Sequence, residues 1–330
     1  MTDRPCVAMA MDPEAAERVL PEDLRRRLAS AVTLVPPDGS GALPAPSVLA
    51  KTGILLTGWG CPPLTARVLA GAPRLAAVVH AAGSVKELVT EEVWQRGIVV
   101  SSAAAANAGP VADFTLAAIT FAAKGALRTA ARYAEGPPGF AARTGTDGCT
   151  VGVIGASRVG RRVLAGLRRA EAGYRVLLAD PYLRLEEAAS LGVELVPLPE
   201  LCRRSTVVSV HAPELPETRG LLDAGMLALI PDGGVVVNTA RGSIVDTEAL
   251  TRECATGRLD AYLDVTDPEP LPPGHPLLAL PNVQITPHIA GAQGNEARRL
   301  GAFAAAEVER FLAGLPLHGA VRHEDLARLA

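Results

Sequence analysis

The chain has 330 residues, of which 48% are hydrophobic and 20% charged, and its formal net charge is -3. This composition excludes a mostly disordered protein, and the scattered arginines provide no basic surface for binding nucleic acid. The length accommodates two domains of ordinary size.

The cysteines and the first residues bear on the location of the protein. Five cysteines, at positions 6, 61, 149, 202 and 254, are far apart and form no CxxC pair. This spacing predicts reduced thiols, a cytoplasmic protein and no metal site. The first residues, MTDRPCVAMAMD, carry charge too early for a signal peptide, and no segment is long enough for a membrane span. We therefore expect no membrane partner.

Short apolar runs alternate with helical segments over the first hundred residues. Strands are expected at residues 6–11, 31–35, 53–57, 75–79 and 98–100. Helices are expected from Asp12-Pro13 onward, over 64–70 and over 91–95, with Thr90 as the cap of the last. This alternation predicts a parallel, doubly wound first domain.

The second half of the chain repeats this plan. Asn107-Ala108-Gly109-Pro110 interrupts the alternation, and a long helix is expected after it. Six strands follow, at residues 151–154, 175–179, 206–210, 235–237, 261–263 and 283–285, as a complete dinucleotide-binding sheet requires. The last helix carries Leu300, Phe303 and Val308 on one stripe, and no strand is expected after it. The predicted fold is α/β, with two doubly wound parallel-sheet (Rossmann-like) domains and a cleft between them.

A nucleotide-binding loop follows the strand at 151–154. Residues 155–160, GASRVG, have the GxGxxG form except that Ser157 stands at the second glycine position. Such a loop brings a pyrophosphate to the amides of a helix N-terminus. Asp180 follows Gly160 by twenty residues, where its carboxylate can accept from a ribose hydroxyl and repel the extra phosphate of NADP. The pattern favours NAD, and NADP stays the less favoured alternative, kept open by the nearby cation of Arg184.

Three polar residues follow the later strands of this series. Arg241 comes after VVVNTA, Glu269 after a strand ending in Leu263-Asp264, and His288 after Ile285-Thr286-Pro287. A histidine donates protons near neutral pH, a carboxylate beside it favours the imidazolium, and an arginine holds a substrate carboxylate. Beside a nicotinamide, this set can reduce a 2-oxo acid. The simpler alternatives are a surface salt bridge for Arg241 and a structural role for His288, while His211 is expected to pack against the cofactor.

These motifs together resemble the D-isomer-specific 2-hydroxyacid dehydrogenase family over essentially the whole chain. The matching segments are Asn107 with VADF at 111–114, the loop at 151–160, Asp180-Pro181, HAP at 211–213 with Thr218, VNTARG at 237–242, LDV at 263–265 with Glu269-Pro270, and TPH at 286–288. The chain departs from the family pattern at Ser157, at Asp113, where glutamate is usual, and in a shorter loop at 82–86.

The resemblance implies a role for each site residue. Arg241 would bind the substrate carboxylate and carbonyl, and His288 would be the acid/base paired with Glu269. Gly83 and Ser84 would present backbone amides to the substrate, with Trp59 and Asn107 beside them. Asp264 would lie near the nicotinamide amide. The full expected set of cofactor contacts is Gly155, Ser157, Arg158, Val159, Gly160, Asp180, His211, Pro213, Thr218, Thr239, Ala240, Arg241, Asp264, His288 and Gly291.

The resemblance also implies an assembly. Residues 1–106 plus 290–330 would form the substrate-binding domain, and residues 107–289 the NAD-binding Rossmann domain, through which the chain would form a homodimer. The substrate is left open between a glyoxylate/hydroxypyruvate-type and a phosphoglycerate-type acid, with selectivity set by Trp59 and the loop from Gly83 to Lys86. The alternative from another class is an NAD(H)-sensing binding protein or corepressor of the same fold.

Overall fold

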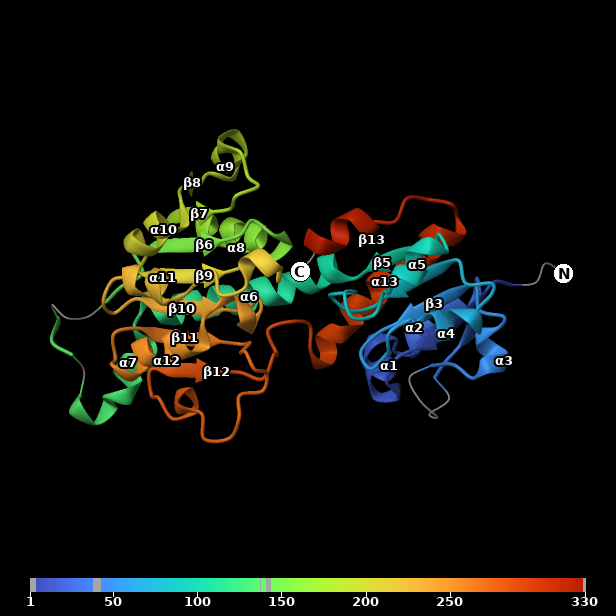
Figure 1. The fold of residues 1–330 in the computed structure, drawn as a ribbon, viewed down its shortest axis with the longest axis horizontal. Helices are drawn as coiled ribbons and strands as arrows, with labels where there is room; N and C mark the ends of the chain where they lie inside the picture. The colour runs from blue at the N-terminus through green and yellow to red at the C-terminus, as the bar shows by residue number, and fades with distance from the viewer. Residues whose placement is uncertain (1–3, 38–42, 137, 141–143, 329–330) are drawn as a thin grey trace. The chain divides into compact units, whose positions relative to one another are not determined.

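The computed structural model describes residues 4–37, 43–136, 138–140 and 144–328. The described residues up to Asn107 and those from Ala292 onward form one compact unit, and Ala108 to Gly291 form the other. Figure 1 shows that each unit is a twisted sheet with helices on both faces. The predicted architecture of two parallel-sheet α/β units is therefore confirmed.

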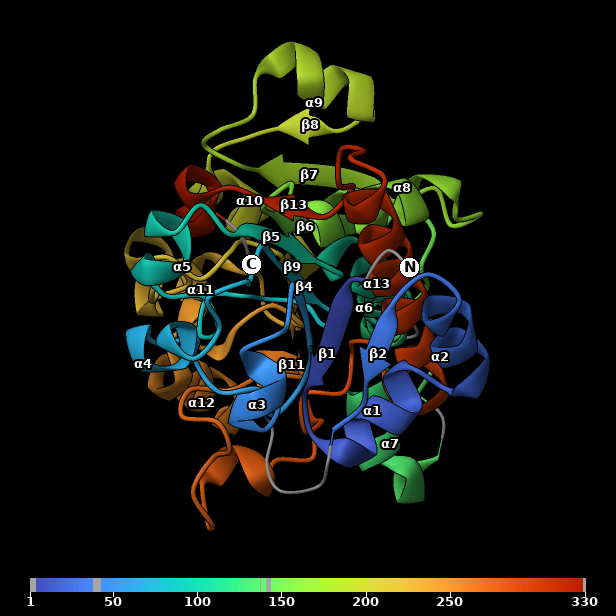
Figure 2. The same cartoon turned by 90° about the vertical axis from the view of Figure 1, so that its right-hand side faces the viewer.

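The first unit is built on a sheet in the order β13-β5-β4-β3-β1-β2. Its parallel strands are β1 (Cys6–Ala10), β2 (Thr33–Val35), β3 (Ile54–Thr57), β4 (Ala77–His80) and β5 (Val99–Ser102). One face is covered by α1 (Pro13–Val19), α2 (Glu22–Ala29) and α13 (Ala297–Leu312), and the other by α3 (Pro46–Leu49), α4 (Ala66–Ala70) and α5 (Glu91–Gln95) (Figure 2).

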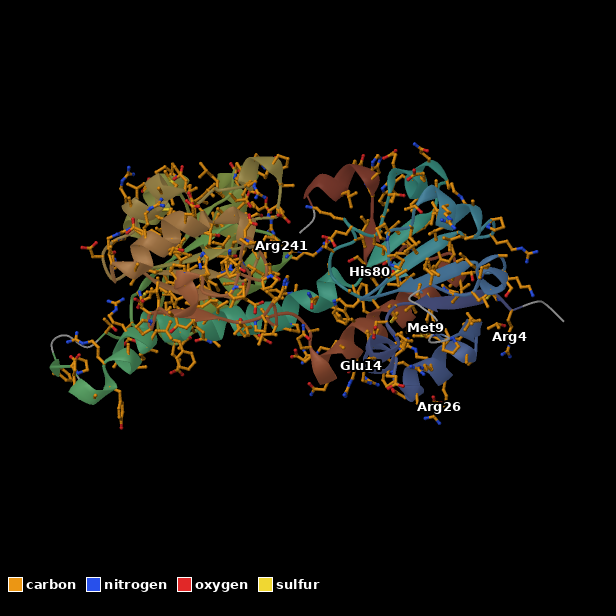
Figure 3. The ribbon with its side chains drawn as sticks, turned by 60° about the horizontal axis from the view of Figure 1, so that its bottom comes forward. Arg4, Met9, Glu14, Arg26, His80 and Arg241 are labelled. Carbon is orange, nitrogen blue, oxygen red and sulfur yellow. The ribbon has the colours of Figure 1, made fainter. Side chains whose placement is uncertain are left out.

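Both faces of this sheet are apolar because both are covered. Along β1, Met9 packs against the α1, α2 and α13 side, whereas Ala8 packs against the opposite helices. Figure 3 shows Met9 inside this layer, while Glu14 and Arg26 project outward from α1 and α2. The continuous apolar runs in the sequence thus reflect strands that are buried on two sides.

Two expectations for the first unit were wrong. A short strand, β13 (Ala320–Val321), does follow the last helix and pairs antiparallel with β5. It is held by a tertiary contact, because the buried Glu307 carboxylate of α13 accepts hydrogen bonds from Ser101 Oγ and the Gly319 amide. Thr90 stands at the N-cap position of α5, but the expected side-chain cap is absent, since its hydroxyl donates to the Leu64 carbonyl, 2.8 Å away.

The second unit is built on a parallel sheet in the order β12-β11-β10-β9-β6-β7-β8. The strands are β6 (Thr150–Ile154), β7 (Arg175–Ala179), β8 (Glu194–Leu195), β9 (Val207–Val210), β10 (Val235–Asn238), β11 (Asp260–Leu263) and β12 (Val283–Ile285). One face packs against α6 (Ala104–Ala123) and α8 (Arg158–Arg169), and the other against α10 (Leu198–Arg204), α11 (Ala224–Leu229) and α12 (Thr247–Ala255). Helices α7 (Ala126–Ala131) and α9 (Leu185–Leu191) complete it.

Two expectations for this half of the chain were also wrong. Helix α6 begins at Ala104, so the segment from Asn107 to Pro110 lies inside it instead of preceding it. The helix begins early because Ser102 Oγ accepts from the Ala104 amide, 3.1 Å away. Pro110 has no backbone N–H to donate, and the free energy of burying one face of α6 offsets the cost of this missing hydrogen bond. The sheet also has a seventh strand, β8, which is two residues long and too short to show a period of two.

Two general expectations concern membranes and thiols. In the part of the chain that the structure describes, no helix combines the length and the apolar character that crossing a bilayer requires. The five cysteines form no disulfide. Burial raises the pKa of the Cys61 and Cys254 thiols to about 12, which keeps both protonated and unreactive.

Candidate active site

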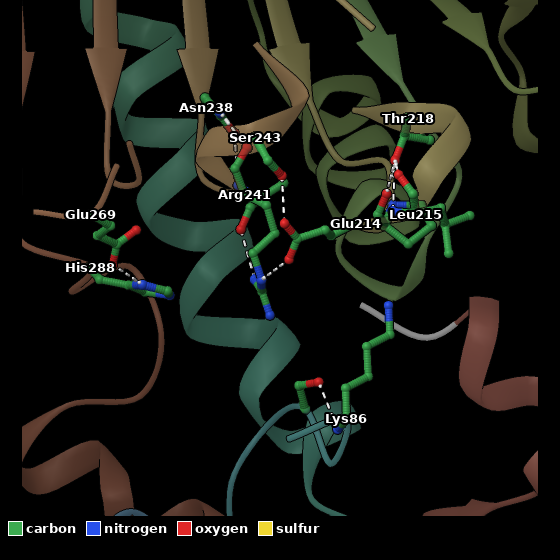
Figure 4. A network of polar contacts seen from close by, with 12 residues as sticks. Lys86, Glu214, Leu215, Thr218, Asn238, Arg241, Ser243, Glu269 and His288 are labelled. Carbon is green, nitrogen blue, oxygen red and sulfur yellow. Dashed lines mark hydrogen bonds and ion pairs between the residues drawn. The ribbon is translucent and has the colours of Figure 1, made fainter. Parts of the chain in front are cut away.

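The three predicted catalytic residues lie at the carboxyl edge of the second sheet. Strands β10, β11 and β12 are adjacent and parallel, so their carboxyl ends lie along one edge. Arg241, Glu269 and His288 lie on the segments that directly follow these strands, and Figure 4 shows their side chains in one view. In parallel α/β sheets, ligands bind at this edge.

His288 and Glu269 form a direct pair. Nδ1 of His288 lies 2.7 Å from Oε1 of Glu269. Because an ionised carboxylate only accepts hydrogen bonds, Nδ1 carries the donated proton, and Nε2 is the ring nitrogen that can exchange a proton with a ligand. The two side chains are 51% and 41% exposed, so a ligand can reach them from solvent. This is the arrangement of an acid/base histidine held by an orienting carboxylate.

A strained turn places the His288 side chain. His288 has a φ of 55°, a left-handed conformation that costs free energy for a residue other than glycine. The buried Asp264 carboxylate holds the turn by accepting from Thr286 Oγ1 at 2.6 Å, the Ile289 amide at 2.8 Å and the Ala290 amide at 2.9 Å. Asp264 therefore has a structural task that the sequence did not indicate, and its expected contact with a nicotinamide amide stays a prediction.

Arg241 is positioned by its own loop. The Asn238 side chain donates to the Arg241 carbonyl and accepts from the Ala240 amide, which closes the turn after β10. Gly242 follows because there is no room for a side chain: a Cβ there would lie 2.0 Å from the Thr266 carbonyl carbon, on the segment that leads to Glu269. The loops that carry Arg241 and Glu269 are thus packed directly against each other.

Glu214 is a site residue that the sequence reasoning missed. One carboxylate oxygen accepts from the Ser243 hydroxyl at 2.6 Å, and the other lies 4.0 Å from Arg241 Nε (Figure 4). It follows the HAP segment after β9, and nothing in the sequence pattern of that segment connects it to Arg241. An acid at this place gives the arginine an internal partner, with which an anionic ligand must compete.

The nucleotide loop has the shape that a pyrophosphate requires. Gly155 has a φ of +93°, and a Cβ there would lie 2.8 Å from the Ala212 amide nitrogen. A Cβ at Gly160 would lie only 2.1 Å from the Gly155 carbonyl oxygen. Ser157 replaces the second glycine and caps α8, since its hydroxyl accepts from the Gly160 amide at 3.2 Å. The departure from GxGxxG therefore keeps the helix N-terminus, where a phosphate can bind the remaining amides.

We expect Gly160→Ala to abolish measurable NADH binding and to lower the melting temperature, because the added methyl group would force the loop away from α8. The matched control is Gly109→Ala, which adds the same methyl group within α6, where it meets no atom within 4 Å. Calorimetry and thermal melts of both variants check this. If Gly160→Ala bound NADH as tightly as Gly109→Ala, the loop would not be the nucleotide site.

Asp180 stands at the end of β7 as predicted from the spacing. Its carboxylate accepts from the Ala156 amide of the nucleotide loop at 2.7 Å and from the Tyr182 amide at 2.8 Å. These bonds fix the acid next to the loop, and its remaining lone pairs can accept from a ribose hydroxyl. The neighbouring Arg184 is exposed.

Among the strand-ending histidines, burial separates His288 from the other two. His211 follows β9, is 3% exposed and lies within hydrogen-bond distance of Ser209, while His80 ends β4 and contacts the Thr57 hydroxyl. Burial lowers the pKa of His211 to about 3 and that of His80 to about 4, so both rings are neutral near pH 7. His211 packs beneath the nucleotide loop, 3.3 Å from where a Gly160 Cβ would lie. Of the three, His288 alone is exposed and paired with a carboxylate.

Several other predicted cofactor residues shape the loops around this edge. The Thr218 hydroxyl donates to the Pro213 carbonyl at 2.7 Å and closes the turn at Pro216–Thr218. Thr239 is buried and hydrogen-bonded to Thr115 of α6 at 2.8 Å. Arg158 is exposed at the start of α8, whereas Val159, Ala240 and Gly291 are half-buried. Their contacts with a cofactor stay predictions.

The predicted substrate residues lie in the first unit. Gly83 and Ser84 follow β4 and are half-buried, and Trp59, after β3, is 41% exposed. Asn107 has a structural partner, because its side-chain oxygen accepts from the Ala292 amide at 2.8 Å. No group of three metal-ligating side chains occurs among residues 4–328 outside the gaps noted above.

Comparison with known proteins places these features in context. Residues 117–290 match the model for the D-isomer specific 2-hydroxyacid dehydrogenase, NAD binding domain. A D-3-phosphoglycerate dehydrogenase of Archaeoglobus fulgidus is 36% identical over 259 residues, which are 78% of this chain and 49% of that protein. A glyoxylate reductase of Korarchaeum cryptofilum is 33% identical over 260 residues, 76% of this chain and 77% of that protein. The chain spans about half the length of the D-3-phosphoglycerate dehydrogenases it matches.

Solved structures extend the likeness to nearly the whole chain. A crystal structure of a Thermus thermophilus protein has a TM-score of 0.77 and 31% identity, covering 96% of this chain and 100% of that one. D-lactate dehydrogenase of Aquifex aeolicus, complexed with NAD and lactic acid, has a TM-score of 0.72 and 25% identity, covering 94% and 96%.

Proposed function

The chain belongs to the D-isomer specific 2-hydroxyacid dehydrogenase family, and we propose that it interconverts D-2-hydroxy acids and 2-oxo acids by hydride transfer with NAD. The observation that carries the proposal is the 2.7 Å hydrogen bond between His288 and Glu269, on the same sheet edge as Arg241. A proton donor and a cation for a carboxylate are the two groups that reduction of a 2-oxo acid requires of the protein.

The residues of this set have distinct roles in the proposed reaction. When bound, the nicotinamide would supply or accept the hydride. Arg241 binds the substrate carboxylate and polarises the carbonyl, so its hold strengthens as negative charge develops on the oxygen. His288 donates the proton to that oxygen from Nε2 during reduction and takes it back during oxidation. Glu269 stabilises the imidazolium and fixes the ring orientation.

The two units divide the binding work in this proposal. The first unit is the substrate-binding domain, in which the Gly83 and Ser84 amides hold the substrate carboxylate, with Trp59 and Asn107 alongside. The second unit is the NAD-binding domain, where the glycines of the loop and the N-terminus of α8 hold the pyrophosphate. The cradle at Gly155 and Gly160, which a Cβ would fill, fits a dinucleotide.

NAD is proposed over NADP because of Asp180. A carboxylate fixed between the Ala156 and Tyr182 amides places negative charge where a 2′-phosphate would have to bind. Repulsion between the Asp180 carboxylate and the 2′-phosphate would disfavour binding of NADP.

We propose that the substrate is a small 2-oxo acid. The function is tested by measuring whether the protein reduces any of a set of such acids. Purified protein is given glyoxylate, hydroxypyruvate, pyruvate and longer 2-oxo acids with NADH or NADPH, and absorbance at the nicotinamide band is followed. We expect turnover with at least one acid and a higher kcat/KM with NADH than with NADPH. Tight NADH binding without turnover of any acid would contradict the proposal and favour a sensing protein.

We also propose that the chain forms a homodimer through the second unit. A groove of about 410 Å³ lies between α6, α7 and the ends of β11 and β12, lined by Phe114, Ala118, Phe121, Leu127 and Tyr262 among others. Phe121 is 61% exposed there. An apolar surface of this kind is typical of an interface. Sedimentation of the wild type should show a dimer, and a monomer at micromolar concentration would contradict this.

A further inference from the structure

The turn that carries His288 is built around one buried carboxylate. Asp264 follows β11 and is 2% exposed, and its Oδ1 accepts from Thr286 Oγ1 at 2.6 Å and from the Ile289 amide at 2.8 Å. Its Oδ2 accepts from the Ala290 amide at 2.9 Å. The Asp264 carbonyl also accepts from the His288 amide at 2.9 Å. Asp264 therefore holds His288 and the residues on both sides of it.

The ring of His288 depends on this turn for its direction. The side chain is 51% exposed, so packing confines it little, and its Nδ1 meets Glu269 on another segment of the chain. Figure 4 shows the ring directed toward the Glu269 carboxylate. The backbone at His288 has a φ of 55°, which costs free energy for a residue with a Cβ. The hydrogen bonds to Asp264 offset this cost, and a relaxed turn would move Nε2 of the ring.

The donors around Asp264 require an acceptor at both of its side-chain oxygens. A carboxylate only accepts, and it can serve one hydroxyl and two amides at once. The amides of Ile289 and Ala290 are backbone groups, whereas the Thr286 hydroxyl belongs to a side chain. A substitution at Thr286 can therefore remove one of the three bonds and leave the backbone groups as they are. An asparagine at position 264 would instead turn an NH₂ group toward one of the donors.

On the basis of the proposed function, we propose that Asp264 and Thr286 are positioning residues of the acid/base: their hydrogen bond stabilises the left-handed turn at His288 and so aims Nε2 at the substrate oxygen. All of the residues that form this turn lie in the second unit. Proton transfer requires the donor at a defined place, and a displacement of about 1 Å can cost about 10²-fold in rate. This role is distinct from the contact with a nicotinamide amide that the family resemblance implies for Asp264.

The test removes the Thr286 hydroxyl and keeps the shape of the side chain. Thr286→Val is compared with Thr286→Ser, which retains a hydroxyl, and with Asp264→Asn, which replaces one acceptor oxygen with an NH₂ group. Thr251→Val is the matched control, because the Thr251 hydroxyl donates to the Thr247 carbonyl within α12 at 2.6 Å.

Two kinds of measurement follow the His288 ring. Steady-state kinetics at saturating NADH give kcat and KM for a 2-oxo acid that the wild type reduces, and fluorescence titration gives the dissociation constant of NADH. Proton NMR of the protein without ligand records the downfield Nδ1–H signal of the hydrogen bond between His288 and Glu269. This signal is assigned by its loss in His288→Ala.

We expect Thr286→Val to lower kcat about tenfold, the scale of one hydrogen bond to a charged group, with KM and NADH affinity as in the wild type. The KM should persist because Arg241, which binds the substrate carboxylate, lies on a different loop. The Nδ1–H signal should weaken in Thr286→Val. Asp264→Asn should lower kcat further, and Thr286→Ser and Thr251→Val should behave as the wild type.

A wild-type kcat in Thr286→Val would overturn the proposal, as would a Thr286→Ser variant that is as slow as Thr286→Val. Weaker NADH binding with a wild-type kcat would also overturn it, because the effect would then pass through the cofactor. If the wild type turns over no 2-oxo acid, the proposed function fails, and the NMR signal still decides the positioning role. An unchanged signal in Thr286→Val then overturns that role, and a weakened signal supports it.

Discussion

His288→Ala reduces 2-oxo acids at least a hundredfold more slowly than the wild type and still binds NADH: this is the result we expect from the geometry at the edge of the second sheet. Removing the ring removes the proton donor that Glu269 orients, and loss of general acid/base catalysis costs about 10²- to 10⁴-fold. NADH affinity should persist because the glycine loop and Asp180 lie elsewhere on the sheet, at β6 and β7.

The matched control is His318→Ala. His318 is an exposed histidine of the first unit, whose backbone amide donates to Glu307 and whose side chain has no part in the proposed chemistry. Turnover by stopped-flow absorbance and NADH titration by fluorescence measure the two quantities separately. Undiminished turnover in His288→Ala would show that His288 is not the acid/base. Loss of NADH binding together with turnover would indicate that the variant site is misfolded.

The second large effect is expected for Arg241→Ala, which should raise KM for the 2-oxo acid and lower kcat. The guanidinium contacts the substrate before reaction and holds it more strongly as charge develops on the carbonyl oxygen, so both constants change. Loss of one such donor to a developing oxyanion costs about 10²- to 10³-fold, and loss of the carboxylate contact adds to this in kcat/KM.

Two companion variants separate charge from shape. Arg241→Lys keeps a positive charge but loses the planar fork, and we expect it to recover only part of the activity. Arg252→Ala removes an exposed arginine from α12, where it forms a 4.0 Å surface pair with Glu248, and should leave both constants as in the wild type. Steady-state kinetics over a range of acid concentrations provide the measurement. Wild-type constants in Arg241→Ala would rule out the substrate role.

The Glu214 carboxylate and the Ala240 carbonyl orient the Arg241 guanidinium. The Glu214 carboxylate, held by Ser243, lies 4.0 Å from Arg241 Nε, while Nη1 of Arg241 donates to the Ala240 carbonyl at 2.7 Å. Both contacts hold the guanidinium in one place without using all of its five donors. The arginine is thus oriented before a substrate arrives, which lowers the entropic cost of ordering its side chain, while the carboxylate still competes with an incoming anion.

The sequence by itself determined the parts of this protein that depend on local chemistry. Continuous apolar runs predicted strands that are buried on two faces, and β7 and β12 lie where they were predicted. The spacing from Gly160 to Asp180 and the polar residues after β10, β11 and β12 predicted where a nucleotide and an acid/base pair belong. These signals are readable because strand period, glycine conformation and strand ends follow from neighbouring residues alone.

Only the tertiary structure decided the features that join distant residues. Helix α6 runs through Pro110 because one of its faces is buried, and β8 and β13 are two-residue strands that exist through their partners in the sheet. The contact between Glu214 and Arg241 and the hold of Asp264 on the His288 turn join segments more than twenty residues apart. Such contacts leave no period in the sequence, since the free energy that favours them comes from packing and hydrogen bonds between segments that meet only in the folded chain.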